Sequence, residues 1–191
     1  MKLLAIYGSP RENGNTDILL NEAVKVAGTN KYAVEKLFIR DLNIKPCRGC
    51  RACDTTGNCV IFDDMTAKVY PLLETCDIVV ISSPVFYYGL PGHLKCMIDR
   101  AQCFWAKKYL IKSQISNLKF EIERRGGFIC AGATKGEKLF DGVRLTVKYF
   151  YDSFNIKYAE ELFVRRVDQK GEVLAVDAVK DAYEFGKKIT A

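Results

Sequence analysis

The residues whose types and spacing indicate chemistry most directly are four cysteines between positions 47 and 59. Cys47, Cys50, Cys53 and Cys59 form a C-x-x-C-x-x-C-x5-C pattern. Four thiolates at this spacing can surround one iron–sulfur cubane, because soft irons prefer sulfur ligands and short C-x-x-C steps are typical of bacterial cluster motifs. The pattern therefore predicts that these four residues bind a [4Fe–4S] cluster.

Two alternatives to a cluster stay open for these cysteines. A zinc site with four cysteine ligands usually has two C-x-x-C knuckles separated by a longer spacer, whereas three of the present cysteines lie in one run. Free or redox-active thiols are the second alternative. The remaining cysteines are scattered along the chain and are expected to be core or incidental residues: Cys76, Cys96, Cys103 and Cys130.

A second set of candidate residues follows the apolar run 2–7 and supplies hydroxyl, amide and guanidinium donors. Its members are Ser9, Arg11, Asn13, Asn15 and Thr16, with a glycine at position 14. A loop that opens a helix after a strand is suited to phosphate, because the free N–H groups and the positive dipole end of the helix point at it. The loop has neither the G-x-G-x-x-G nor the G-x-x-x-x-G-K-[ST] spacing, so a standard NAD fold and a P-loop NTPase are disfavoured. The alternative role for Asn15 or Thr16 is a helix cap.

A third set lies after the apolar run 78–81 and brings several aromatic residues into one loop. Its members are Pro84, Val85, Phe86, Tyr87, Tyr88 and Gly89. Loops normally contain few bulky aromatics, so this run predicts a wall for a flat ligand such as a flavin ring, with core packing as the alternative. Ala131 and Gly132 follow a later strand and are expected on the other side of the ring or along the ribityl chain.

The elements that must position these residues alternate between strand and helix. Hydrophobic patterns predict strands over 2–7, 34–39, 78–81, 127–131 and 158–164, and helices over 17–26, 65–75, from 92 onward, 138–154 and 176–189. This order indicates an α/β protein with a three-layer sandwich around a five-stranded parallel sheet. In the strand order 2-1-3-4-5, the first and third loops lie side by side at the switch point, so the phosphate and the flavin ring would belong to one molecule.

Two segments interrupt this alternation: the cysteine-rich loop 46–64 and the basic, aromatic segment 104–125, whose structure the sequence leaves open. Such insertions often carry the individual function of a protein. No sharp change in composition marks a boundary, so we expect residues 1–191 to form a single domain with the cluster-binding loop at 46–64.

Composition excludes several classes of protein. Hydrophobic residues make up 49% of the chain, which is enough for a core, and no apolar run is long enough for a membrane span. The net charge of +6 comes from basic residues dispersed among 23 acidic ones, so no nucleic-acid partner is expected. The short apolar N-terminus does not match a signal peptide, so a cytoplasmic location and reduced cysteines are expected.

Motifs within residues 1–136 stand in a recognisable order. They are Gly8-Ser9-Pro10-Arg11, Gly14-Asn15-Thr16, Ser83-Pro84-Val85-Phe86 with Gly89, and Lys95 with Asp99-Arg100. In this order they resemble the NADPH-dependent FMN reductase family. The resemblance implies a flavodoxin-like fold, FMN bound without a covalent link, and a fold-supporting role for Lys95, Asp99 and Arg100.

The cysteine motif added to this arrangement resembles the iron–sulfur flavoprotein family of anaerobic prokaryotes. That resemblance implies that Cys47, Cys50, Cys53 and Cys59 bind [4Fe–4S], that electrons pass between the cluster and FMN, and that the protein is a homo-oligomer, either a dimer or a tetramer.

The function expected from these features is electron transfer from ferredoxin or a similar one-electron carrier, through the cluster and FMN, to an unidentified acceptor. In this scheme the cofactors carry the chemistry and no catalytic side chain is assigned. One alternative is an NAD(P)H-dependent FMN or quinone reductase with a structural metal site. Another is a flavin- or cluster-based sensor. The absence of a recognisable output domain counts against this alternative.

Overall fold

The computed structural model describes residues 1–29, 32–111 and 123–191 of the chain. Within these ranges one sheet contains β1 (Lys2–Tyr7), β2 (Ala33–Phe38), β3 (Ile78–Pro84), β4 (Arg125–Gly132) and β5 (Lys157–Arg165). All neighbouring strands are parallel and their order is β2-β1-β3-β4-β5. The predicted flavodoxin-like sheet is therefore confirmed.

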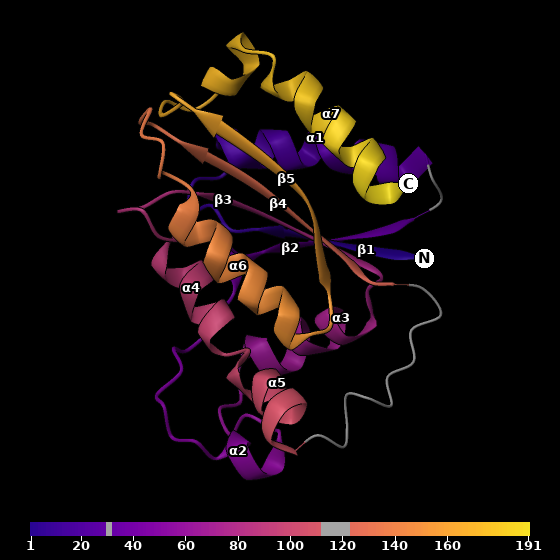
Figure 1. Cartoon of the computed structure of the whole chain (residues 1–191), viewed down its shortest axis with the longest axis vertical. Helices are drawn as coiled ribbons and strands as arrows, with labels where there is room; N and C mark the ends of the chain where they lie inside the picture. The colour runs from indigo at the N-terminus through magenta and orange to yellow at the C-terminus, as the bar shows by residue number, and fades with distance from the viewer. Residues whose placement is uncertain (30–31, 112–122) are drawn as a thin grey trace.

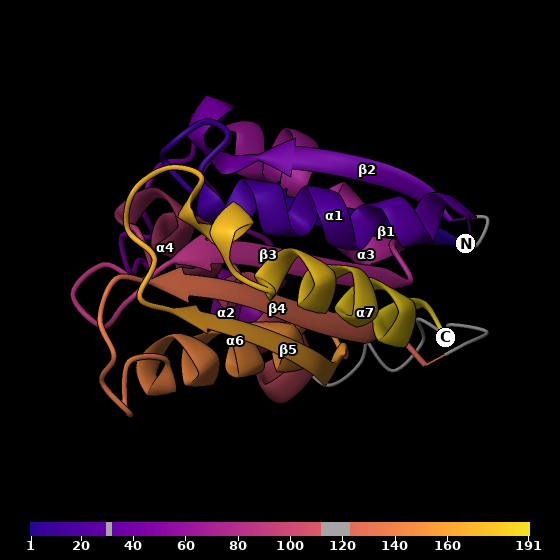
Figure 2. The same cartoon turned by 90° about the horizontal axis from the view of Figure 1, so that it is seen from above.

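Helices cover both faces of the sheet. They are α1 (Asn15–Thr29), α2 (Cys53–Thr56), α3 (Tyr70–Thr75), α4 (Gly92–Asp99), α5 (Gln102–Ala106), α6 (Asp141–Ser153) and α7 (Ala178–Thr190). Shorter turns are the 3-10 segments η1 (Ile39–Asp41) and η4 (Glu172–Ala175) and the π-helical segments η2 (Met65–Val69) and η3 (Lys107–Ile111). Helices α1 and α7 lie together on one face, whereas α3, α4 and α6 lie on the other (Figures 1 and 2).

The two layers of core follow from alternation along the strands. In β1, Leu4 and Ile6 pack with α3, α4 and α6, whereas Leu3, Ala5 and Tyr7 pack with α1 and α7. The central strand β3 is buried along nearly its whole length. A strand whose two faces both meet helices must be apolar on both, which explains the unbroken run of branched residues at 78–81.

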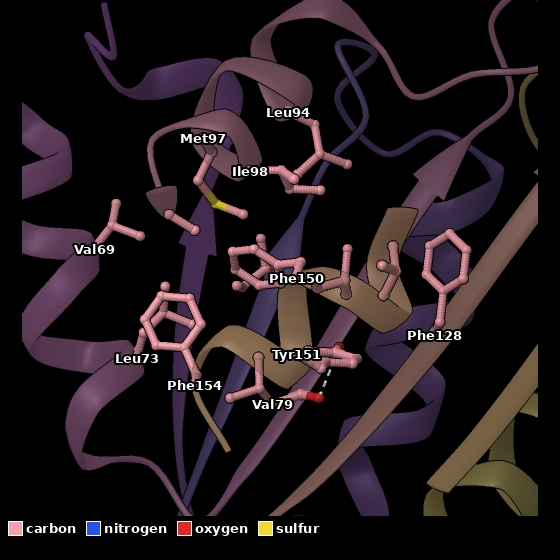
Figure 3. Packing of buried hydrophobic residues seen from close by; sticks show 14 of the residues in the cluster. Val69, Leu73, Val79, Leu94, Met97, Ile98, Phe128, Phe150, Tyr151 and Phe154 are labelled. Atoms are coloured by element: carbon pink, nitrogen blue, oxygen red, sulfur yellow. Dashed lines mark hydrogen bonds between the residues drawn. The ribbon is translucent and has the colours of Figure 1, made fainter. Parts of the chain in front are cut away.

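Tyr151 of α6 fixes one helix layer to the sheet (Figure 3). Its ring is fully buried, and its hydroxyl lies 3.0 Å from the Val79 carbonyl and 2.7 Å from the Gly127 carbonyl. Because a buried phenolate would have no compensating charge here, burial raises the pKa of Tyr151 well above its ordinary value. The neutral hydroxyl therefore serves as a donor between two adjacent strands.

The cysteine loop leaves the carboxyl edge of the sheet after β2 and reaches α5. Its one helical turn, α2, packs against α5 and η3, and it lies below α4 and α5 in the view of Figure 1. Gly57 ends this turn with a φ of 69°, and a Cβ there would stand 2.6 Å from the Lys107 side chain. Glycine is favoured at this position because a side chain would be strained in the left-handed backbone and would displace the Lys107 side chain.

The two irregular segments of the sequence are only partly regular in three dimensions. The predicted helix 65–75 is η2 followed by α3, with Pro71 in the first turn of α3, where its missing N–H is tolerated. The segment 104–125 contains part of α5, all of η3 and the start of β4, and its residues 112–122 lie outside the described residues. In the described parts of the chain, every helix is too short or too polar to cross a lipid bilayer.

Candidate functional site

A pocket opens at the carboxyl ends of β1, β3 and β4, where the predicted phosphate and ring loops meet. It is lined by Ser9, Pro10, Arg11, Gly14, Asn15, Thr16, Pro84, Val85, Phe86, Ala131, Gly132, Ala133, Val167, Asp168 and Lys170. Most of the residues expected at the flavin site from the sequence are thus brought together. Asn13, Tyr87, Tyr88 and Gly89 do not line this pocket.

Thr16 is the residue whose environment fits an anionic ligand best. It lies in the first turn of α1 and is 2% exposed, and its Oγ1 has no hydrogen-bond partner. The first N–H groups of a helix also have no intrahelical acceptor and carry the positive end of the dipole. A buried hydroxyl without a partner beside such N–H groups fits a phosphate oxygen.

The backbone of the first loop is hydrogen-bonded to an ion pair between the buried Asp17 and the half-buried Arg40. The Asp17 carboxylate accepts from Arg40 Nη1 at 3.0 Å and from the Asn13 N–H at 3.1 Å. Arg40 also donates to the Ser9 carbonyl at 3.3 Å. Burial raises the pKa of Asp17, and the charge of Arg40 opposes this shift. Asn13 has a left-handed backbone, with a φ of 51°, and it is the Asn13 N–H that binds Asp17.

The loop between β5 and α7 forms a wall of the pocket that was not predicted from the sequence. Arg11 Nη1 donates to the Asp168 carbonyl at 2.8 Å, and Asn15 Nδ2 donates to the Gln169 carbonyl at 2.9 Å. The N–H of Gly171 donates to Asn15 Oδ1 at 2.9 Å. The signal that could have found this wall is topological, because the loop after β5 emerges at the same sheet edge as the other loops.

The aromatic loop after β3 makes a tight turn. Phe86 and Gly89 exchange two backbone hydrogen bonds of 2.9 Å, so Tyr87 and Tyr88 are the two central residues. Tyr87 and Tyr88 have φ values of 50° and 60°, and both rings are exposed. Of these three aromatic residues Phe86 lines the pocket, whereas Tyr87 and Tyr88 do not.

A second pocket gathers the four cysteines of the sequence motif. Cys47, Cys50, Cys53 and Cys59 all line it, together with Arg48, Arg100 and Cys103. Cys47 and Cys50 are exposed, whereas Cys53 and Cys59 are half-buried. Cys103 was expected to be core or incidental, and it is buried, but it also borders this pocket. Its sequence separation from the motif gave no signal of that proximity.

The thiols of this pocket differ in electrostatic environment. The Ala52 N–H and the Arg48 guanidinium stabilise the Cys50 thiolate, so the pKa of Cys50 lies below its ordinary value. Burial and the neighbouring Asp54 raise the pKa of Cys53. Among the described residues, no three His, Cys, Asp or Glu side chains are already grouped closely enough to hold a single metal ion.

Comparison with known proteins places this arrangement among flavoproteins. Residues 1–135 match the sequence model of the NADPH-dependent FMN reductase family. An iron–sulfur flavoprotein of Methanosarcina thermophila is 30% identical over 128 residues, which cover 66% of each chain. An iron–sulfur flavoprotein of Methanocaldococcus jannaschii is 28% identical over 157 residues, which cover 82% of this chain and 72% of the relative. The chain thus spans about two thirds of the first relative's length.

The fold is shared with a solved structure of a flavone reductase. The TM-score is 0.71 at 17% sequence identity, and the match covers all of this chain and 62% of the other. At this identity the comparison concerns the fold and not the substrate.

Proposed function

The chain belongs to the NADPH-dependent FMN reductase family, a family of oxidoreductases, and on that premise we propose that it transfers electrons between a [4Fe–4S] cluster and FMN. The observation that carries the proposal is the convergence of all four motif cysteines on one pocket of a chain with an FMN reductase fold. When bound, the cluster supplies one-electron chemistry and FMN exchanges one electron or two.

The FMN site that we propose is the pocket above β1, β3 and β4. Thr16 and the first N–H groups of α1 bind the phosphate, and Ser9 shapes the loop because its hydroxyl accepts from the Arg11 N–H at 3.0 Å. Phe86 packs along one side of the ring. No acid or base is required of these residues, which bind and orient the cofactor.

The cluster site that we propose uses Cys47, Cys50, Cys53 and Cys59 as ligands. Two of these thiols are exposed and two are half-buried, so the pocket is open to solvent on one side. An open position of this kind suits exchange of electrons with a docked carrier, and ferredoxin or a similar one-electron carrier is the donor that we propose. The basic side chain of Arg48 at the pocket provides charge complementary to an acidic carrier.

A homo-oligomer is proposed because α5, η3 and α6 carry several exposed apolar side chains, of which Trp105 packs on Tyr109 and lines a hollow with Tyr149. Trp105, Tyr109, Leu110, Leu145 and Tyr149 are all exposed there. We propose that a second copy of the chain covers this surface. Sedimentation velocity would test it: Trp105→Glu with Tyr149→Glu should shift a dimer or tetramer to monomer, and a wild-type monomer would contradict assembly.

A second candidate function is direct reduction of FMN or a quinone by NAD(P)H, with a structural metal at the cysteines. The matched family itself favours this candidate, since NADPH-dependent FMN reduction defines it. Rapid-mixing kinetics separates the two, because the flavin is reduced quickly by NADPH in one case and by reduced ferredoxin in the other.

The experiment that tests the main proposal is anaerobic purification followed by cofactor analysis. We expect FMN and about four irons with matching acid-labile sulfide per chain. Cys50→Ala should lose the iron and retain FMN, and Cys96→Ala, a half-buried cysteine outside the motif, should retain both. Stoichiometric zinc without sulfide would refute the cluster.

A further inference from the structure

Both ends of the cysteine loop are hydrogen-bonded to one buried side chain, that of Arg100. This residue follows the last residue of α4 and is 1% exposed. Its Nη1 donates to the Lys45 carbonyl at 2.9 Å, two residues before Cys47. Its Nη2 donates to the Ile61 carbonyl at 2.9 Å, two residues after Cys59. One guanidinium therefore bonds to the chain on both sides of the motif.

Asp63 completes this contact and fixes the orientation of the guanidinium. Its Oδ2 lies 2.7 Å from Arg100 Nη1 and its Oδ1 lies 3.2 Å from Nη2. Asp63 Oδ2 also accepts from the Lys45 N–H at 2.9 Å, and Oδ1 accepts from the Met65 N–H at 3.0 Å. The ion pair is almost completely buried, and bidentate geometry with further hydrogen bonds is what makes such burial tolerable.

Arg100 is in turn connected to the flavin side of the molecule through α4. That helix has eight residues and is therefore about 12 Å long. It begins directly after the loop that contains the aromatic turn. The Tyr70 hydroxyl donates to the Arg100 carbonyl at 2.6 Å, which fixes the backbone at the other end of the helix. The base of the cysteine pocket and the end of the flavin loop are thus joined by one short rigid element.

We propose that Arg100 is a positioning residue for the four-cysteine site, because its bonds to Lys45, Ile61 and Asp63 close the cysteine loop at its base before any metal binds. The inference rests on the proposed function. Ordering a free loop costs conformational entropy, and metal binding must supply that free energy when the site is not preformed. A loop closed in advance retains its metal more firmly.

The rival explanation is that Arg100 only stabilises the fold, and Arg124 provides a matched control for it. Arg124 is 3% exposed and donates to the carbonyls of Leu73, Cys76 and Phe154. It is therefore a second buried arginine that bonds to backbone carbonyls, but these carbonyls lie outside the cysteine loop. A general loss of stability should affect the two arginine variants alike.

The test compares Arg100→Lys with Arg124→Lys. Both proteins are reconstituted anaerobically with iron and sulfide, and the rate of iron release to a chelator is measured. A lysine keeps the charge but cannot bond at once to two carbonyls and both carboxylate oxygens. We expect Arg100→Lys to release iron at least tenfold faster than wild type and to show a broadened EPR spectrum of the reduced cluster. Arg124→Lys should match wild type in both measurements.

Equal iron-release rates in Arg100→Lys and wild type would overturn the inference, as would equal acceleration in both variants. If Arg100→Lys does not fold, the double change Arg100→Met with Asp63→Leu replaces the buried ion pair by apolar side chains, so that no lone charge is left buried, although backbone groups of Lys45, Ile61 and Met65 lose these partners. The double variant should bind FMN like wild type and release iron as fast as predicted for Arg100→Lys. Retention of iron at the wild-type rate would contradict the inference.

The same assay separates this inference from the proposed function. If wild-type protein holds zinc without sulfide, the cluster is refuted, and zinc release then tests Arg100 against Arg124 in the same way. If wild-type protein holds neither iron with sulfide nor zinc, both proposals are wrong.

Discussion

Asn15 and Gly171 are 156 residues apart in the sequence, and the Gly171 N–H donates to Asn15 Oδ1 at 2.9 Å. The Asn15 Nδ2 donates to the Gln169 carbonyl, so both ends of the amide are engaged by the β5–α7 loop. The adjacent Thr16 hydroxyl has no partner. The sequence presents these two neighbouring residues as similar phosphate donors, but Asn15 is bonded to the β5–α7 loop, and the unpartnered Thr16 hydroxyl is the one that we propose for the phosphate.

Thr16→Val should weaken FMN binding without destabilising the free protein. A hydrogen bond to a charged group contributes about 1.5–3 kcal/mol, so the dissociation constant should rise by about ten- to a hundredfold. The free energy of unfolding of the apoprotein should stay the same or increase, because the substitution removes a buried hydroxyl that has no partner. FMN titration and urea unfolding of the apoprotein measure the two effects. Unchanged FMN affinity would show that Thr16 does not bind the phosphate.

Asn15→Ala, unlike Thr16→Val, should destabilise the free protein. It removes two hydrogen bonds to the β5–α7 loop, so the free energy of unfolding should fall by about 1–2 kcal/mol. Trypsin should cleave faster after Arg166 and Lys170, which lie in the loop that Asn15 holds. Thr16→Val serves as the control, since it leaves both hydrogen bonds in place. Wild-type cleavage rates in Asn15→Ala would contradict this role.

The strands of the sheet were predictable because a strand leaves a local hydrophobic pattern in the sequence. The apolar runs at 2–7 and 78–81 reflect burial on two faces, and the observed strands β1 and β3 contain these runs. Thr16 and Phe86 were also predictable as pocket residues, because loops after parallel strands emerge at one edge.

The contacts that remained unpredicted depend on residues distant in sequence. Arg100 and Asp63 are 37 residues apart, and no local pattern indicates that a charged pair will be buried together. The wall at Asp168 comes from a loop whose composition resembles an ordinary polar turn. Tyr87 was expected at the ring and does not line the pocket, because the position of a side chain in a tight turn depends on backbone angles that composition does not reveal.

Asp63→Asn should destabilise the protein in a pH-dependent manner. Burial raises the pKa of Asp63, but hydrogen bonds from Arg100 and Lys45 outweigh this and hold the pKa below its ordinary value of 3.8. The carboxylate therefore stabilises the fold above that pH, and this stability is lost as the pH falls through the lowered value. Leaving Arg100 unpaired should cost about 3–5 kcal/mol at neutral pH.

Urea unfolding of the apoprotein at several pH values measures this difference. The difference in free energy of unfolding between wild type and Asp63→Asn should narrow as the pH falls from 3.8 through the lowered pKa of the folded carboxylate, where Asp63 becomes protonated. Asp168→Asn is the control, since Asp168 is exposed and its ion pair with Arg11 is long, at 4.0 Å. A gap between wild type and Asp63→Asn that stays constant with pH would exclude the assigned role of the carboxylate.

Alkylation should distinguish the cluster cysteines from the others. In the apoprotein, the exposed Cys47 and Cys50 should react first. Cys76 and Cys130 are fully buried and should react only on unfolding, since burial raises the pKa of Cys76 to about 11 and that of Cys130 further. Reconstitution should protect Cys47 and Cys50 and leave the rate at the half-buried Cys96 unchanged. Mass spectrometry reads each site, and equal labelling of Cys50 before and after reconstitution would exclude it as a ligand.

The turn at Tyr87 and Tyr88 stores backbone strain that a more permissive pair of residues should release. Two-residue turns with both central residues at positive φ favour Asn-Gly, and the left-handed conformation costs other residues about 1–2 kcal/mol each. Tyr87→Asn with Tyr88→Gly should therefore raise the free energy of unfolding by about 1–3 kcal/mol. Urea unfolding measures this gain, and a less stable variant would show that the two rings contribute more than the strain removes.

The same double variant also tests why strained tyrosines are present at this position. Tyr87 is fully exposed and does not line the pocket that we propose for FMN, whereas Phe86 does. FMN affinity should therefore stay at the wild-type value in the double variant and fall in Phe86→Ala. If the exposed rings make contact with an electron carrier, the rate of flavin reduction by reduced ferredoxin should fall at low carrier concentration and recover at saturation, because only docking is weakened. A stabilised variant with wild-type kinetics at every carrier concentration would show that the rings have no part in docking.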